Sequence, residues 1–199
     1  MLIRIWRRAA DIGILGPMTK TNWTYDLSHS NVGFSVRHLM VSKVRGQFNA
    51  WGGTLEIDDA DITRSKLDVS IETASIETRD EKRDAHLRSA DFFDADNHPT
   101  LTFKSTSIDK KSDDELAVHG DLTIRGTTRP VTLAVELNGE AKDPWGGTRR
   151  GFTAKTTINR KDFGLNWNAA LEAGGVLVGE KVEITLEIEA IKAASSQAA

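Results

Sequence analysis

The fold of this chain is decided by residues 122–131, which read Leu-Thr-Ile-Arg-Gly-Thr-Thr-Arg-Pro-Val. The stretch predicts a strand, a tight turn and a second strand. In the second strand the apolar residues alternate with mostly polar ones, and the apolar set is Val131, Leu133, Val135 and Leu137. A period of two places that set on one face of the strand.

Similar patterns recur along the chain, and no long amphipathic helix interrupts them. The last such row is Val182, Ile184, Leu186 and Ile188. We count about eight strands, and closure of a sheet removes its exposed edges. The sequence therefore predicts an all-β fold, a single antiparallel eight-stranded barrel.

Two local features interrupt the strand pattern. Thr78 and Glu81 have the spacing of a capping box, which predicts one short α-helix over about 79–89. Gly52 and Gly53 stand where the apolar parity shifts within residues 44–57. A glycine pair at a parity shift predicts a bulge or bend.

The bulk composition limits the classes of function. The chain has 199 residues, a net charge of −3 and no cysteine. Lys and Arg are spread along the sequence, so we expect no nucleic acid partner. No apolar run reaches the roughly 20 residues of a membrane helix, so we expect no stable membrane insertion. Disulfides and cysteine-ligated metals are excluded.

We divide the chain into an N-terminal extension (1–22), expected to be poorly ordered, a barrel domain (23–191) and a disordered tail (192–199). The apolar run near the N-terminus is short and broken by Asp11, with no clear cleavage site. A cytoplasmic location is therefore expected, and a periplasmic or secreted one is the alternative.

The ordered combination of several segments resembles the YceI-like family of polyisoprenoid-binding proteins. The matching segments are WTYDLSHS (23–30), VGFSVRHL (32–39), VRGQF (44–48), SIET (75–78), RDAHLRS (83–89), DFFD (91–94), HP (98–99), VHGDLTIRGTT (118–128) and RKDFG (160–164). The resemblance implies a lipocalin-like barrel whose lumen holds the tail of an isoprenoid lipid, of the quinone or polyprenyl phosphate type. Transport, storage or sequestration of that lipid is the implied role.

Aromatic and aliphatic residues on the inward rows could fill a dry core or line a cavity, and the resemblance favours the cavity. The candidate ligand-binding residues are Phe34, Val36, His38, Leu39, Phe48, Val69, Ile71, Phe92, Phe103, Leu122, Leu133, Val135, Phe152, Phe163, Ile184 and Leu186. Four residues are candidates for the mouth, namely Arg37, His38, Arg83 and His86. Because the sequence has no basic cluster, we expect a quinone or another weakly charged head group.

Catalysis and metal binding have little support. The five histidines show no metal-ligand spacing, so neither a metal nor another cofactor is expected. Ser30, His29 and Asp26 are the residue types of a hydrolase, but neighbours on a strand point to opposite faces. The alternative function is an enzyme acting on a small amphiphile at the barrel mouth, with His38 or His86 as acid–base. A purely structural partner-binding barrel ranks third, and a homodimer is left open.

Overall fold

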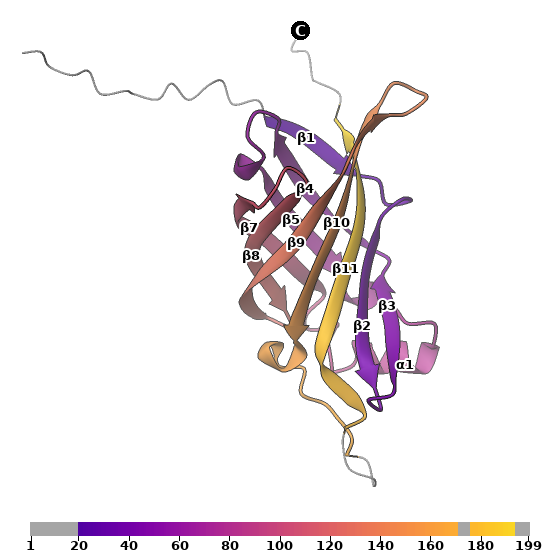
Figure 1. Ribbon diagram of the computed structural model, residues 1–199. Helices are drawn as coiled ribbons and strands as arrows, with labels where there is room; N and C mark the ends of the chain where they lie inside the picture. The colour runs from indigo at the N-terminus through magenta and orange to yellow at the C-terminus, as the bar shows by residue number, and fades with distance from the viewer. Residues whose placement is uncertain (1–19, 171–175, 194–199) are drawn as a thin grey trace, which may run out of the picture.

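The computed structural model describes residues 20–170 and 176–193. Within them the strands form one antiparallel sheet (Figure 1). The strands are β1 (Lys20–Tyr25), β2 (Asn31–His38), β3 (Ser42–Phe48), β4 (Trp51–Asp58), β5 (Lys66–Glu72), β6 (Ile76–Glu77), β7 (Thr100–Lys110), β8 (Glu115–Ile124), β9 (Thr127–Lys142), β10 (Thr148–Asn159) and β11 (Val178–Lys192). Short 3₁₀ helices span Ile62–Arg64, Thr73–Ser75 and Arg160–Phe163.

The sheet closes on itself. Its order runs β1-β4-β5-β7-β8-β9-β10-β11, and β11 pairs with β1 to complete the ring. The closing pairs include Trp23 with Lys192 and Tyr25 with Ala190. Further along β11, β2 pairs with it in place of β1, β3 pairs with β2, and β6 pairs with β3. The predicted eight-stranded antiparallel barrel is confirmed.

The hairpin of β8 and β9 forms as its sequence predicts. The two strands pair from Ile124 with Thr127 onward, which leaves only Arg125 and Gly126 for the turn. Their φ angles are 48° and 70°, so both lie in the left-handed region that a tight hairpin requires. Glycine at the second position adopts this conformation without steric strain, because it has no Cβ.

The strand predicted over residues 44–57 is broken at a different place from the glycine pair. The break lies at residues 49–50, and the inward parity passes there from Phe48 to Trp51. Gly52 and Gly53 lie within β4, in register with β5. Gly53 is required for another reason, because a Cβ on it would lie 2.0 Å from a backbone oxygen of β5.

The helix α1 spans Glu81–Arg88, which is shorter than the predicted 79–89. Its N-cap is Asp80, whose side chain accepts a hydrogen bond from the Arg83 N–H at 3.0 Å. The predicted cap at Thr78 is therefore wrong. Arg79 has a φ of 64°, so the residue after Thr78 cannot belong to the helix.

Thr78 instead fastens α1 to the barrel. Its backbone N–H and its hydroxyl both donate to Asp84, at 2.9 and 2.5 Å. Asp84 is the buried residue of α1. The carboxylate thus holds the helix against the end of β6.

The domain boundaries shift slightly. Strand β1 begins at Lys20, so residues 20–22 belong to the sheet rather than to the extension. Lys192 closes β11 and pairs with Trp23. The rest of the predicted extension (1–19) and tail (194–199) lies outside the described residues.

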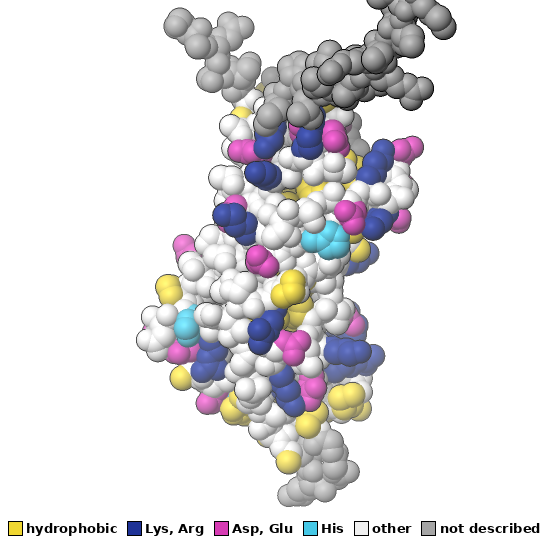
Figure 2. All heavy atoms as spheres, turned by 90° about the vertical axis from the view of Figure 1, so that its left-hand side faces the viewer, with side chains coloured by type: hydrophobic (Ala, Val, Ile, Leu, Met, Phe, Trp, Pro, Cys, Tyr) yellow, Lys and Arg dark blue, Asp and Glu magenta, His cyan; other side chains and the backbone are white. Residues whose placement is uncertain are grey.

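Apolar residues of the ring form one main interior cluster, with a smaller one around Trp23, Ile57 and Ala190. Outside, the face in Figure 2 mixes acidic and basic side chains without a large patch of one sign. None of the helices described here has the length and apolarity needed to cross a bilayer.

Candidate functional site

A cavity of about 280 Å³ lies inside the barrel. Each strand of the ring contributes to its wall, as do β2, β3 and Leu87 of α1. Alternate residues of a strand point inward, so the period-two rows converge on a single space. The wall is almost wholly apolar, and its side chains with polar atoms other than Trp51 are Tyr25, Ser65, Thr156 and Arg160.

Fourteen of the sixteen candidate ligand-binding residues line this cavity. They are Phe34, Val36, Phe48, Val69, Ile71, Phe92, Phe103, Leu122, Leu133, Val135, Phe152, Phe163, Ile184 and Leu186. The inward assignment of these rows therefore matches the geometry. Their contact with a ligand stays a prediction.

His38 and Leu39 do not line the cavity. His38 is the last residue of β2, and Leu39 lies in the following turn with a φ of 52° and 39% of its surface exposed. The period-two row of β2 contributes Val36 to the wall as its last residue. The sequence alone did not show where the strand leaves the enclosed part of the barrel.

Sequence reasoning missed Tyr25 as a wall residue. Its hydroxyl donates to the carbonyl of Thr54 at 3.4 Å, and its ring packs edge-on against Trp51 with centroids 5.2 Å apart. Burial, together with the charge of Asp68, raises the pKa of Tyr25 above its usual value. Tyr25 therefore contributes mainly its ring to the wall, near the end where β1 closes the ring of strands.

Arg160 is the charged residue of the wall; it lies in the RKDFG segment of the family resemblance, but it was not among the candidate site residues. It is 4% exposed. Its guanidinium donates to the carbonyls of Gly179 (2.9 Å), Leu165 (2.5 Å), Trp167 (2.8 Å) and Val178 (3.4 Å). Burial lowers the pKa of Arg160 below its usual value. Its donors are largely committed to the backbone, so it ties the segment after β10 to the start of β11.

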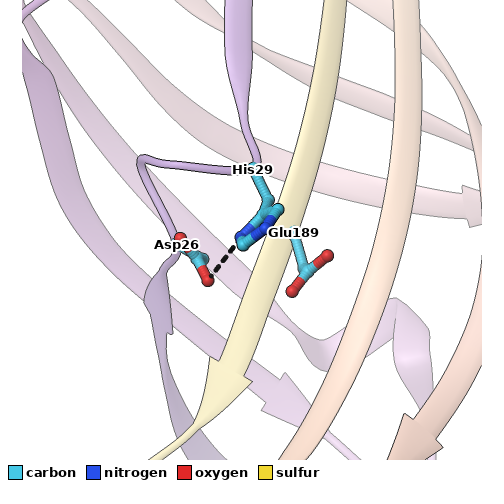
Figure 3. Close-up of side chains that lie close together, drawn as sticks. All are labelled: Asp26, His29 and Glu189. Carbon is cyan, nitrogen blue, oxygen red and sulfur yellow. Dashed lines mark hydrogen bonds and ion pairs between the residues drawn. The ribbon is translucent and has the colours of Figure 1, made fainter. Parts of the chain in front are cut away.

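A polar cluster outside the barrel brings together Asp26, His29 and Glu189 (Figure 3). One ligand atom of each lies within 4.8 Å of the others, which is a spacing that a metal ion could use. The guanidinium of Arg149 already serves these acids, since it contacts Asp26 at 2.6 Å and also bonds Glu189 and, at 3.0 Å, Asp143. The cluster is an ion-pair network centred on that arginine.

The hydrolase residue types do not form a triad. His29 uses the same ring nitrogen, Nδ1, toward Asp26 (3.0 Å) and toward Ser28 (3.1 Å), whereas a triad base needs its two nitrogens on opposite partners. The hydroxyl of Ser30 donates to the Glu189 carbonyl at 3.3 Å and accepts from its N–H at 2.9 Å. Ser30 therefore joins β2 to β11.

The two histidines proposed as acid–base lie outside the cavity wall. His86 Nε2 lies 2.8 Å from Asp91, and the ring packs edge-on against Phe92 and Trp167, with centroids 5.1 and 4.6 Å apart. His38 ends β2. Acid–base chemistry by either residue at the barrel mouth stays a prediction.

Four basic residues that are distant in sequence meet in a groove of about 350 Å³ beside β3 and α1. We call Lys43, Arg45, Arg79 and Arg83 the basic groove. The acid lining it is Glu77, which accepts a hydrogen bond from Gln47 at 3.2 Å. The sequence shows no basic cluster, because these residues are separated along the chain and only the fold brings them to one groove.

The YceI-like domain family matches residues 23–190 of this chain. The chain belongs to the YceI-like family. A UPF0312 protein of Staphylococcus aureus is 41% identical over 170 residues, which cover 85% of this chain and 96% of that relative.

Solved structures share the YceI-like barrel. The YceI protein of Campylobacter jejuni is 31% identical, with a TM-score of 0.69 over 85% of this chain and 96% of that one. BcnA of Burkholderia cenocepacia gives 0.72 at 23% identity, over 83% and 98%. A polyisoprenoid binding domain from Saccharophagus degradans gives 0.65 at 14% identity, over 86% and 98%. The last two likenesses concern the fold alone.

Proposed function

We propose that this protein binds an isoprenoid lipid with the tail inside the barrel, and that it transports, stores or sequesters that lipid. The observation that carries the proposal is the apolar cavity enclosed by a complete ring of strands. Burial of a hydrocarbon tail there gains about 25 cal/mol per Å² of apolar surface. A structural neighbour described as a polyisoprenoid binding domain supports this class of ligand.

The wall favours a quinone or another weakly charged head group. A phosphate inside the barrel would need free cations, since buried charges must be paired. Arg160 is the cation of the wall, and it is engaged with four carbonyls. The rest of the wall is almost wholly apolar, which suits a neutral head group better than a charged one.

Organic extraction of the purified protein, followed by mass spectrometry, tests the binding function. A carrier yields a co-purified prenyl lipid in a constant ratio to protein. Titration of delipidated protein with a prenyl quinone and a prenyl phosphate, each at low and high salt, tests the head group. A preference for the phosphate that disappears in high salt contradicts the quinone assignment.

We infer binding rather than catalysis, because the family has a binding-protein fold and the histidines considered for acid–base work lie outside the wall. Incubation with the extracted lipid should return it chemically unchanged. The cytoplasmic location and a homodimer stay predictions, to be checked by cell fractionation and by sedimentation.

A further inference from the structure

The turn between β2 and β3 exposes three consecutive apolar side chains. We call Leu39, Met40 and Val41 the apolar tip. They are 39%, 60% and 80% exposed. The tip lies at the end of the barrel beside α1 (Figure 1). The Leu39 N–H donates to the carbonyl of Leu177 at 2.9 Å. Val176, the residue before Leu177, therefore lies near the tip, and it is 37% exposed.

The backbone of the tip disfavours the side chains that it carries. Leu39 and Met40 both lie in the left-handed region, with φ values of 52° and 61°. Asn and Gly are the residues that tight hairpins prefer at such positions, because large side chains strain them. Two large apolar residues held in solvent on strained backbone indicate a role outside the barrel's own stability.

Positive charge lies next to the tip. Arg37 on β2 and Arg45 on β3 are exposed, as is Arg79 across the basic groove. In the part of the chain that the structure describes, these three make no side-chain ion pair, whereas Lys43 is paired with Glu183. Glu183, the acid paired with Lys43, also lies within reach of the charge of Arg37.

The tip also adjoins the cavity. Val36 and Val178 line the wall, and Val178 pairs with His38, the residue before the tip. The exposed apolar turn, the free cations and the end of the apolar lumen therefore share one end of the molecule.

We propose that the apolar tip inserts into the interface of an anionic lipid bilayer, while Arg37, Arg45 and Arg79 contact headgroup phosphates. The end of the lumen then faces the membrane from which a tail is drawn. This inference rests on the proposed lipid-binding function. A bilayer fits better than a protein partner, since one turn is much smaller than the roughly 800 Å² per partner of a stable protein interface.

Vesicle flotation tests the docking, with phosphatidylcholine vesicles compared to vesicles that also contain phosphatidylglycerol. The wild-type protein should bind the anionic vesicles and release them in high salt. The double variant Leu39→Asn/Met40→Gly should bind at least tenfold more weakly, from the loss of two apolar side chains. Its thermal midpoint should stay the same or rise, because Asn and Gly suit the turn.

Arg45→Gln tests the electrostatic part. It should weaken binding about fivefold, the value of one cation near an anionic surface. Lys104→Gln, at an exposed position on β7 paired only loosely with Asp68, is the matched control and should change nothing. Trp145→Ser is the apolar control, because Trp145 is 85% exposed on the β9–β10 hairpin at the opposite end.

Loss of vesicle binding in Trp145→Ser but not in Leu39→Asn/Met40→Gly overturns the proposal. The proposal is also overturned if the protein forms a dimer that requires the apolar tip and does not bind vesicles. A separate titration with a prenyl quinone in detergent distinguishes the lipid-binding function from the membrane docking. Failure of that titration with tip-dependent vesicle binding rejects only the lipid cargo, whereas normal quinone affinity with no vesicle binding rejects only the docking.

Discussion

Leu133→Trp should weaken lipid binding without unfolding the barrel. Leu133 is 8% exposed, lies on β9 opposite Val118, and both side chains line the cavity. An indole at this position enters a space of about 280 Å³ and competes with the tail for it. A tail segment of one isoprene unit excluded from the wall loses about 4 kcal/mol, at about 0.8 kcal/mol for each of its five carbon groups.

That loss corresponds to a Kd raised about 700-fold. Overpacking a filled core lowers the free energy of unfolding by about 1–3 kcal/mol. The loss in Leu133→Trp should be smaller, because the lumen has room for the indole ring. The assays are titration of delipidated protein with a prenyl quinone, the lipid content after purification, and the thermal midpoint.

The matched control is Ala134→Trp, which places the same bulk on the exposed outer face of β9. It should leave both the Kd and the midpoint unchanged. An unchanged Kd in Leu133→Trp would show that the ligand does not occupy the lumen. Collapse of the fold in Leu133→Trp alone would show that the interior is a packed core.

Other changes test the frame of the site. Gly46→Ala should cost about 1–3 kcal/mol, since the new Cβ would lie 2.4 Å from the Phe34 ring, and denaturant unfolding measures this. Arg160→Met should cost at least about 3 kcal/mol by leaving buried carbonyls without donors, again by unfolding. Hydrogen bonds from Ser28, Arg149 and His29 hold the pKa of Asp26 in the folded protein below its usual 3.8. The ionised carboxylate therefore stabilises the fold fully above pH 3.8, and this stabilisation is lost as the pH falls through the lower pKa of the folded state. Asp26→Asn should lower the thermal midpoint at neutral pH and lose that deficit in acid.

Controls separate these effects from general damage. Gly52→Ala meets no atom within 4 Å and should leave stability nearly unchanged. Asp96→Asn, at an exposed side chain that makes no ion pair among the described residues, should leave the acid dependence of the thermal midpoint unchanged. An equal cost for the two glycine changes, or a midpoint deficit in Asp26→Asn that persists at low pH, would contradict the packing and the ion-pair arguments respectively.

The sequence by itself determined the strands and their inward faces. Side-chain direction in a strand depends only on parity, so rows such as Val131, Leu133 and Val135 identified the wall before any pairing was known. The same logic placed the row Val182, Ile184, Leu186 and Ile188 on the wall. Edge avoidance then made a closed barrel the natural result.

Local signals were less reliable where a long-range contact competed with them. Thr78 looked like a helix cap, but its hydroxyl bonds the buried Asp84, and Asp80 caps α1 instead. The glycine pair in β4 marked a close approach to β5, while the strand broke three residues earlier. Partners across the sheet are not visible in a local pattern.

Only the tertiary structure decided where the lumen ends and what stands at its ends. His38 continues an inward row but lies past the enclosed part of β2, and Arg160 is on the wall because four carbonyls from two segments surround it. The basic groove likewise joins β3 to the residues before and within α1. Parity is a property of one strand, whereas enclosure and charge clustering depend on which strands become neighbours, and that is fixed only when the barrel closes.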